Sequence, residues 1–321
     1  MSAGLDVLQP GLASSVQDAG RPGHAASGVG RAGALDAGLL ALANALCGNA
    51  ADTAGIEITL RGPVLRFDQA TSFAFCGAPF AATLDGRPCL GWQRHTAHAG
   101  ALLQLGDAPY SARAWLALGG GIALPRVLGS RSNDLNAALG PLPRLLRAGD
   151  RLPLGEASSA APATHWALAP RHWLPTDTAP LRLLAGRDLP LLDAASRSAL
   201  FTAFWRVDAA SNRVGLRLHG PALRFVQPLE CISEPCVAGT VQLPPSGQPI
   251  VLLGEHPVSG GYPRIGQIAA VDLPALAQLR PGATLTLRPI GLRDAMRLLR
   301  ARDRALAALL GHIRQRLAET Y

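Results

Sequence analysis

The sequence has 321 residues, a length typical of two domains, and 48% of them are hydrophobic against 16% charged, a balance typical of a folded globular protein. Its 30 basic residues are all arginine, and with 22 acidic residues they give a formal net charge of +8 at pH 7. Because this sequence contains no lysine, it carries no Walker A phosphate loop, no Schiff-base lysine and no lysine for biotin or lipoyl attachment.

The opening of the sequence lacks a basic segment followed by an apolar core, and no stretch reaches the roughly 18 consecutive apolar residues of a membrane span. The five cysteines are odd in number and show no Cys-x-x-Cys spacing, which is typical of reduced thiols in a chain large enough to bury a core. We therefore expect a cytoplasmic protein with no membrane partner.

The arginines are scattered except near the C-terminus, and aromatic residues make up only 5% of the sequence. Nucleic-acid binding needs a clustered basic surface and, for single strands, aromatic stacking, so we expect no nucleic-acid partner. Of the eight histidines only His95 and His98 lie close together, without a cysteine or carboxylate at a ligand-like spacing, so no metal site is expected.

Asp36 is a favourable helix N-cap, and the apolar residues after it predict a helix that ends at Gly48. Short alternating or β-branched runs such as 56–60, 64–67 and 284–288, separated by Gly, Pro and Asp, predict many short strands. The sequence therefore predicts a mainly β fold with a few helices. The helices are expected over 36–46, near 189–204 and over about 291–318.

Three segments recur in the same order in the two halves of the sequence, which indicates two homologous modules. The first pair, Leu60–Phe67 and Leu218–Phe225, is identical at six of eight positions. Looser matches join Leu146–Leu152 to Leu279–Leu285, and Gly120–Gly129 to Gly260–Gly266. We expect a first module over 1–155, a linker over 156–180, a second module over 181–290 and an Arg-rich C-terminal helix over 291–321.

A first candidate ligand site lies near the N-terminus. Gln17, Asp18 and Arg21 place an amide, a carboxylate and a guanidinium within five residues. A guanidinium suits a carboxylate ligand, with Asp18 orienting Arg21, although an internal salt bridge within a turn explains the same residues. The glycine-rich loop 28–33 precedes the helix cap Asp36, which favours either an anion held by backbone N–H groups or a tight turn into the helix.

The densest polar set lies in the second module. Gly260 and Gly261 allow a ligand to approach the backbone, and Tyr262 adds a ring and a hydroxyl. His256 is a candidate general acid or base because an unperturbed imidazole titrates near neutral pH. A hairpin turn is the simpler explanation of the two glycines. The other polar residues of this set are Glu230, Glu234, Gln242, Ser246, Gln248, Glu255 and Ser259.

Motifs that follow one another over about residues 5–290 carry a family resemblance. They include Gln9–Leu12, Val16–Asp18, Gly20–Arg21, Gly119–Ile122, Val127–Ser132, Ser233–Glu234, Gly239–Thr240, Gly247–Pro249 and Gly260–Pro263. On these motifs the sequence resembles the biotin-dependent carboxyltransferase subunit family, which includes the C subunits of 5-oxoprolinase, the KipA regulators and a segment of urea carboxylase.

The resemblance implies a tandem of cyclophilin-like β-barrels. It also implies the C subunit of an ATP-dependent 5-oxoprolinase that opens a small lactam, 5-oxoproline, to glutamate. Such a subunit is active only in a heteromeric complex, together with the oxoprolinase A subunit, and with a companion B subunit that is allophanate hydrolase subunit 1-like. ATP belongs to the complex as a whole.

Two alternatives remain open at this point. One is a KipA-like regulatory protein that binds a kinase inhibitor. The other is a biotin-dependent carboxyltransferase acting on urea or a similar amide, with its biotin carried on another protein because this sequence has no lysine. The segment Pro257–Ser259 replaces the Gln-Thr-Thr that many relatives carry before Gly-Gly-Tyr, which argues against carboxybiotin binding.

Taken with the resemblance, the two polar sets give the candidate site. Glu57, Glu234 and His256 are expected to be catalytic. The residues expected to bind substrate are Gln17, Asp18, Arg21, Gly33, Asp36, Gln242, Gln248, Ser259, Gly260, Gly261 and Tyr262.

Overall fold

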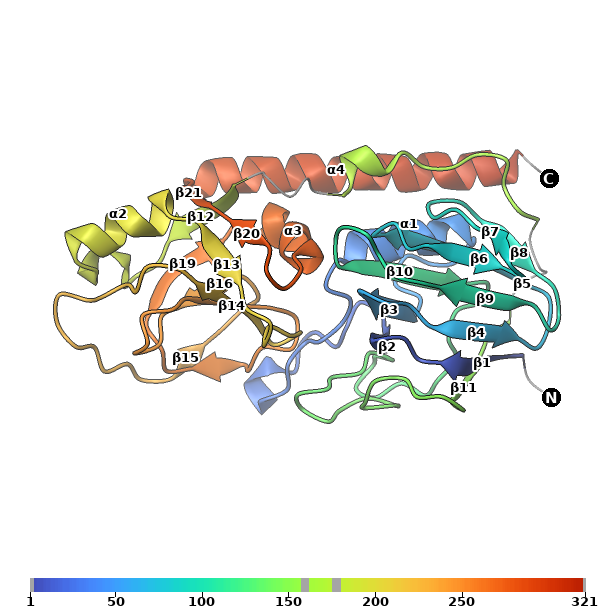
Figure 1. The fold of residues 1–321 in the computed structure, drawn as a ribbon, viewed down its shortest axis with the longest axis horizontal. Helices are drawn as coiled ribbons and strands as arrows, with labels where there is room; N and C mark the ends of the chain where they lie inside the picture. Colours follow the sequence, from blue (N-terminus) through green and yellow to red (C-terminus); the bar gives the residue numbers. More distant parts are fainter. Residues whose placement is uncertain (1–2, 157–161, 175–179, 320–321) are drawn as a thin grey trace. The chain divides into compact units, whose positions relative to one another are not determined.

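The structure, a computed structural model, describes residues 3–156, 162–174 and 180–319 (Figure 1). The chain folds as two units. Unit 1 is built from Met1–Arg21, Ala32–Leu174 and Ala305–Tyr321, and unit 2 from Pro22–Arg31 and Pro175–Arg304. The glycine-rich loop that the sequence marked as a candidate anion site thus belongs mostly to unit 2.

The linker expected over 156–180 lies in part outside the described residues. Its described stretch is attached to unit 1 by backbone hydrogen bonds. Thr164 donates to the carbonyl of Arg94, and Leu168 donates to the carbonyl of Trp92.

Unit 1 contains two antiparallel sheets. The first has the strand order β11-β1-β4-β9-β6-β7, with β1 Gly4–Gln9, β4 Val64–Phe67, β6 Ala82–Leu84, β7 Arg87–Pro88, β9 Leu102–Leu105 and β11 Arg151–Pro153. The second has the order β2-β3-β10-β5-β8, with β2 Ala13–Gln17, β3 Gly55–Thr59, β5 Thr71–Gly77, β8 His95–Ala97 and β10 Arg113–Leu118.

The core of unit 1 is formed by apolar side chains of both sheets. In β1, Leu5 and Val7 are fully buried while Asp6 between them is only half-buried, because successive side chains of a strand point to opposite faces. Phe67 of the first sheet stacks on Phe73 of the second, with ring centroids 5.5 Å apart. Every residue of β5 and β10 is buried, since helix α1 packs against both strands (Figure 1).

Helix α1 (Ala37–Leu46) confirms the first predicted helix. The side chain of Asp36 caps it by accepting a hydrogen bond from the Leu39 backbone N–H at 3.1 Å. Gly48 follows with a φ of +77°, a left-handed conformation that favours glycine just beyond a helix.

Unit 2 contains an eight-stranded sheet with the order β20-β13-β14-β17-β16-β19-β12-β21. Its strands are β12 Leu181–Ala185, β13 Trp205–Val207, β14 Gly215–His219, β16 Thr240–Gln242, β17 Ile250–Leu252, β19 Arg264–Ile268, β20 Thr284–Leu285 and β21 Leu287–Pro289. The two outermost strands, β20 and β21, are separated only by Thr286. The sheet therefore curls until its edges nearly meet, as a barrel does.

The single strand expected over 284–288 is wrong in one respect, because the structure divides this run into two strands. Leu285 pairs with Trp205 in an antiparallel ladder, whereas Leu287 pairs with Leu181 in a parallel one. The run is divided because its two halves bond to opposite edges of the sheet. The wider prediction of a mainly β fold with a few helices is confirmed.

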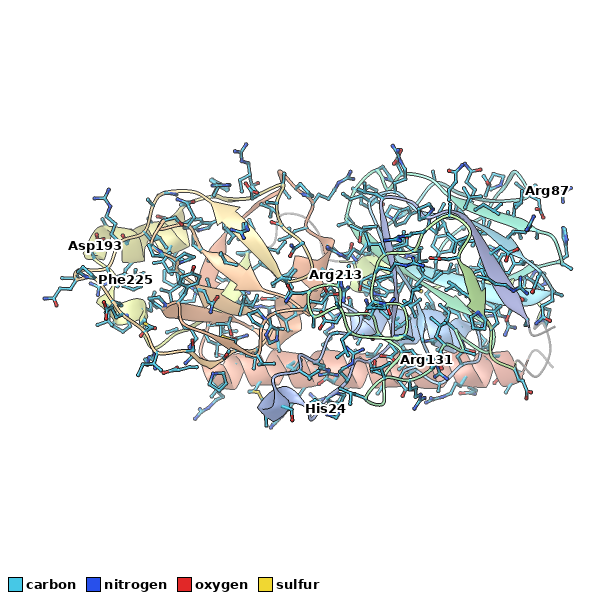
Figure 2. The ribbon with its side chains drawn as sticks, turned by 90° about the horizontal axis from the view of Figure 1, so that it is seen from below. His24, Arg87, Arg131, Asp193, Arg213 and Phe225 are labelled. Atoms are coloured by element: carbon cyan, nitrogen blue, oxygen red, sulfur yellow. The ribbon has the colours of Figure 1, made fainter. Side chains whose placement is uncertain are left out.

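The remaining elements of unit 2 lie around this sheet. Helix α2 (Ala194–Thr202), near the expected 189–204, is capped by Asp193, which Figure 2 shows beside Phe225. Helix α3 covers Leu273–Gln278, and β15 (Glu234–Pro235) pairs with β18 (Ser259–Gly260) in a two-stranded sheet. Short 3₁₀ turns occur at Ala25–Ser27, Pro170–His172, Leu189–Leu191 and Ala270–Asp272.

One repeated segment forms the same turn in both units. The backbone N–H of Gly149 donates to the carbonyl of Val7 in unit 1, and that of Gly282 donates to Val207 in unit 2, each at 2.8 Å. The two glycines have φ values of +87° and +84°, which only glycine adopts without strain. The turn therefore explains why the repeated segment keeps a glycine at this position.

Helix α4 (Leu292–Ala318) confirms the C-terminal helix. It carries arginines along most of its length, and the guanidinium of Arg316 lies 4.7 Å from the ring centroid of Trp166. In the part of the chain that the structure describes, no helix is both long and apolar enough to span a membrane.

Candidate functional site

Asp18, at the end of β2, binds a segment far along the chain. Its Oδ1 accepts hydrogen bonds from the hydroxyls of Ser130 and Ser132, both at 2.6 Å, and its Oδ2 accepts from the Arg131 backbone N–H at 2.6 Å. Arg21 is 1% exposed and donates to the carbonyl of Ser132. The two charged residues that the sequence grouped at the N-terminus therefore converge on the segment 130–132.

Gln17 supplies the amide of this group and is fully buried in β2. Its Nε2 donates to the Ser15 hydroxyl at 3.0 Å and to the Asn133 carbonyl at 2.9 Å. Its Oε1 is buried and has no hydrogen-bond partner among the described residues. Among the described residues this amide oxygen therefore receives no hydrogen bond, whereas both carboxylate oxygens of Asp18 do.

Gly33 lies where two loops pass closely. A Cβ atom at this position would come 2.9 Å from the backbone nitrogen of Gly20, and the φ of Gly33 is +91°. The loop into α1 therefore depends on a glycine there.

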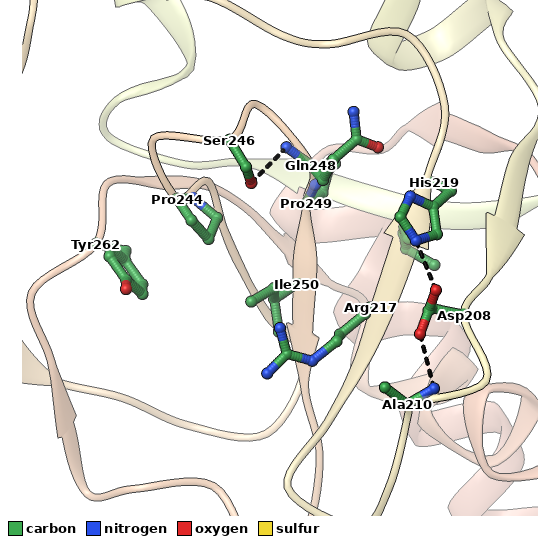
Figure 3. A pocket seen from close by; sticks show the side chains of 11 residues that line it. Asp208, Ala210, Arg217, His219, Pro244, Ser246, Gln248, Pro249, Ile250 and Tyr262 are labelled. Carbon is green, nitrogen blue, oxygen red and sulfur yellow. Dashed lines mark hydrogen bonds and ion pairs between the residues drawn. The ribbon is translucent and has the colours of Figure 1, made fainter.

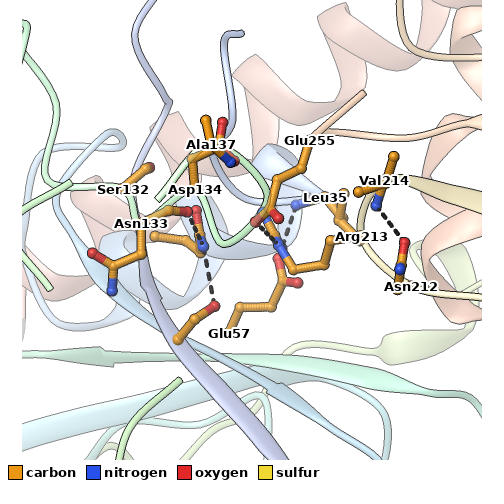
Figure 4. A network of polar contacts seen from close by, with 12 residues as sticks. Leu35, Glu57, Ser132, Asn133, Asp134, Ala137, Asn212, Arg213, Val214 and Glu255 are labelled. Atoms are coloured by element: carbon orange, nitrogen blue, oxygen red, sulfur yellow. Dashed lines mark hydrogen bonds and ion pairs between the residues drawn. The ribbon is translucent and has the colours of Figure 1, made fainter. Parts of the chain in front are cut away.

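Glu57 is buried within unit 1 and is surrounded by donors (Figure 4). Its Oε2 accepts from the Leu35 backbone N–H at 2.9 Å and from the Trp115 indole N–H at 3.0 Å. Its Oε1 lies 3.6 Å from Nε of Arg113. Glu57 on β3 thus binds Leu35, the residue directly before the helix cap Asp36. The structure therefore places the two predicted site residues Glu57 and Asp36 near each other.

In unit 2, Glu234 lies between two arginines. It pairs with Gly260 in the β15–β18 ladder, and its carboxylate forms ion pairs with Arg187, at 2.6 Å, and with Arg264. Two cations on one carboxylate favour its ionised form. Glu234 is therefore held as a fixed anion beside the paired backbone of Gly260.

The side chain of Gln242, on the buried strand β16, also lies beside Gly260. Its Nε2 lies 3.6 Å from Sγ of Cys236, and a Cβ atom built on Gly260 would come 2.5 Å from that Nε2. A side chain at position 260 would therefore displace the amide of Gln242 from its present place. Ser259, Gly260 and Gln242 form one cluster with Glu234, as the sequence grouped them.

His256 precedes this cluster in the chain. Its Nδ1 lies 2.8 Å from the carbonyl oxygen of Pro257, and because a carbonyl only accepts, Nδ1 must carry the proton. In the tautomer with the proton on Nδ1, Nε2 presents a lone pair. The neighbouring Glu255 is buried and paired with Nε of Arg213 at 2.6 Å, which fixes the backbone next to His256 (Figure 4).

Of the other three predicted residues of unit 2, Gln248 and Tyr262 line a pocket of about 540 Å³ (Figure 3), whereas Gly261 does not line it and passes close to Ser233 and Cys231. Gln248 braces the backbone of Gly220 there, accepting from its N–H at 2.9 Å and donating to its carbonyl at 3.2 Å. Tyr262 forms another wall and is 47% exposed. Tyr262 and Gln248 thus line the same cavity.

The sequence reasoning missed three ionisable residues of this pocket, which are Asp208, Arg217 and His219. Nε2 of His219 lies 2.5 Å from a carboxylate oxygen of Asp208. The backbone N–H of Ala210 and, after it, His219 lower the pKa of Asp208. One signal was present, because His219 stands in the repeated octapeptide where the first copy has Arg61.

No group of three or more metal-ligating side chains occurs among the residues that the structure describes. The chain thus offers two polar groups, one in each unit, and a pocket in unit 2. Their chemistry is that of carboxylates, amides, an imidazole and guanidiniums, which suits acid–base work on a small polar substrate.

Comparison with known sequences points to one group of proteins. A family model described as "Carboxyltransferase domain, subdomain A and B" matches residues 27–289. The chain is 34% identical to the C subunit of 5-oxoprolinase from Haemophilus influenzae, over 93% of this chain and 95% of that protein. It is 37% identical to the C subunit of 5-oxoprolinase from Escherichia coli, over 91% of this chain and 93% of that protein.

A larger protein also contains a segment similar to this chain. Urea amidolyase of Lachancea kluyveri is 28% identical over 95% of this chain, which is 18% of that protein. The crystal structure of the Kluyveromyces lactis urea amidolyase superposes with a TM-score of 0.87 at 28% identity, over 95% of this chain and 20% of that chain. The chain therefore spans about a fifth of these urea amidolyases.

Proposed function

Because the chain belongs to the family of carboxyltransferase domains, we propose that it is the C subunit of an ATP-dependent 5-oxoprolinase, which opens 5-oxoproline to glutamate. One observation carries this proposal. Two relatives named as C subunits of 5-oxoprolinase match the chain over nearly their whole length, at 95% and 93% coverage. The urea amidolyases match it only as one segment of a much longer protein.

Opening a lactam requires water to add to the carbonyl carbon and a proton to reach the departing nitrogen. We propose that His256 accepts the proton of water at Nε2, since its Nδ1 is held by the Pro257 carbonyl. Gln242 and the backbone at Gly260 provide a polar surface beside the anion Glu234. Glu234, flanked by Arg187 and Arg264, holds this surface in place.

The polar group of unit 1 has a supporting role in this proposal. Asp18 and Glu57 accept several hydrogen bonds each, so they fix the loops that lead to Arg21 and to Asp36. The expectation that Arg21 binds a carboxylate stays a prediction. Gln17, with its buried Oε1, is the residue of this group whose acceptor remains available.

ATP would supply the driving force for opening the lactam at the level of the complex. This sequence has no lysine and hence no Walker A loop. We therefore propose that the nucleotide is held mainly by the companion A and B subunits. We place this complex in the cytoplasm, a proposal supported by the five free cysteines of this chain.

The test is reconstitution of the chain with the A and B subunits. The wild-type complex is expected to produce glutamate from 5-oxoproline only when ATP is added. His256→Asn is expected to lower kcat by about 100-fold or more, because the base is removed. His312→Asn, on the exposed face of α4, serves as the matched control and should keep full activity. A wild-type complex that makes no glutamate overturns the function, and a fully active His256→Asn complex overturns the assigned base.

The urea amidolyase relatives favour one second candidate, a biotin-dependent carboxyltransferase. In that reaction the carboxyl group would arrive on a biotinylated partner, since this sequence offers no lysine for biotin. Supplying the chain with a carboxybiotinylated carrier and urea decides between the two. Carboxyl transfer to urea in the absence of glutamate formation would favour the second candidate.

A further inference from the structure

Arg217 is the cation of the unit 2 pocket that has no fixed partner. Its guanidinium makes no hydrogen bond or ion pair with any residue that the structure describes, and the residue is exposed. By contrast, His219 is bound to Asp208 at 2.5 Å. The charge of Arg217 acts on Asp208 and helps to lower its pKa, but the hydrogen-bond partners of that carboxylate are His219 and the backbone N–H of Ala210. The guanidinium donors of Arg217 thus remain to bind a ligand.

The strand geometry aims Arg217 into the cavity. Arg217 and His219 are two residues apart on β14 and lie on the same face of the sheet. Arg217 pairs with Ile250 of β17, so its apolar stem lies along a hydrophobic neighbour. Figure 3 shows the guanidinium extending from β14 toward the side of the pocket on which Tyr262 lies.

The remaining walls suit a small ring rather than a chain of phosphates. Tyr262 presents a ring face, and Pro244, Pro249 and Ile250 are apolar. A polyphosphate would need several cations, whereas Asp208 places a carboxylate in the wall. The volume, about 540 Å³, is typical of a site for a small molecule.

We propose that this pocket binds the carboxylate of the lactam substrate, with the guanidinium of Arg217 paired to it and the ring of Tyr262 against the lactam. This inference rests on the proposed function, and it names the place where that function recognises its substrate. The class of ligand is a small cyclic monocarboxylate.

The pocket and the candidate catalytic cluster share one short segment of the chain. Tyr262 lines the pocket, and Gly260, two residues earlier, pairs with Glu234 and passes the amide of Gln242. A lactam anchored by its carboxylate at Arg217 would therefore reach toward this cluster along residues 259–262. The arrangement separates recognition of the carboxylate from chemistry at the amide.

The experiment compares Arg217→Gln with the matched control Arg206→Gln. Arg206 is an exposed arginine on the neighbouring strand β13, opposite His219, and it does not line the pocket. In the reconstituted complex, Arg217→Gln is expected to raise KM for 5-oxoproline about 10- to 100-fold with a much smaller change in kcat. Arg206→Gln should leave both constants unchanged. Arg217→Lys should recover part of the loss, because it restores the positive charge but not the two parallel N–H donors of a guanidinium.

Direct binding to the full chain provides an independent measurement. 5-Oxoproline and its uncharged carboxamide are titrated by calorimetry into the wild-type chain and the two glutamine variants. We expect the acid to bind the wild type at least about 10-fold more tightly than the carboxamide, and this preference to vanish in Arg217→Gln.

The outcomes separate the two proposals. An active wild-type complex whose KM is unaffected by Arg217→Gln overturns the pocket assignment and leaves the function standing. A wild-type complex that makes no glutamate overturns the function, and the titration then decides the pocket alone. Equal affinity of the wild-type chain for the acid and the carboxamide would overturn the pocket assignment in either case.

Discussion

Glu57 illustrates how a single buried carboxylate organises its surroundings. Its two oxygens face the Leu35 N–H, the Trp115 indole and the Arg113 guanidinium, and it is 2% exposed. Replacing Glu57 by Gln removes the negative charge that faces this buried arginine. We expect Glu57→Gln to lower the free energy of unfolding by about 3 kcal/mol, measured by urea denaturation.

The control for this prediction is Glu230→Gln, the same chemical change at an exposed position, which should alter stability by less than about 0.5 kcal/mol. The pair of measurements also separates two roles of Glu57. If Glu57→Gln were as stable as the wild type yet inactive in the complex, the carboxylate would act directly in the reaction rather than by holding the fold.

Interactions between residues far apart in sequence were out of reach of sequence reasoning. Asp18 was expected to orient Arg21, three positions away. In the structure Asp18 accepts from the nearby Gly20 N–H, but its other partners are the hydroxyls of Ser130 and Ser132 and the Arg131 N–H, more than a hundred residues along the chain. The sequence predicts that a buried carboxylate or guanidinium is hydrogen-bonded. Which residues supply the hydrogen bonds depends on the tertiary structure.

At the scale of the element, α1 depends on both its cap and its packing. A helix of 10 residues is too short to be stable alone, and eight of its residues are buried against its surroundings. Removing the cap in Asp36→Ala is expected to destabilise the protein by about 1 kcal/mol in urea denaturation, because the Leu39 N–H loses its acceptor.

Asp36→Asn keeps a side-chain oxygen at the cap and provides the matched comparison. It should retain most of the stability that Asp36→Ala loses. Equal losses in both variants would show that the charge of Asp36, rather than its capping oxygen, stabilises this end of α1.

Local signals explain which elements were predictable. The start of α1 at Asp36 and the C-terminal helix follow from capping and spacing within a few residues, so the sequence located both. The division of the run 284–288 did not follow, because it arises from pairing to two different strands at opposite edges of the sheet. Arg217 and His219 were missed for the same reason, since their pocket is assembled from separate strands and loops.

At the scale of the whole molecule, the cysteines divide by burial. Burial raises the pKa of Cys47 and of Cys89 to about 12, and raises the pKa of Cys76 well above its usual value. Cys236 is 6% exposed, with a pKa raised by burial, whereas Cys231 is only half-buried. Since the thiolate is the reactive form, an increase from 9 to about 12 reduces its fraction roughly 1,000-fold at neutral pH.

We therefore expect a thiol reagent at pH 7 to modify Cys231 first and Cys236 more slowly in the native protein. The three cysteines of unit 1 should react only when that unit opens. Peptide mass spectrometry across a urea series measures each site separately, so Cys47 and Cys76 report the opening of unit 1 and Cys236 reports that of unit 2. If Cys47 reacted as fast as Cys231 without urea, α1 would not be packed on β5 and β10 in solution.

Two different urea midpoints would mean that the units unfold independently, whereas one shared midpoint would mean that they unfold as a single cooperative structure.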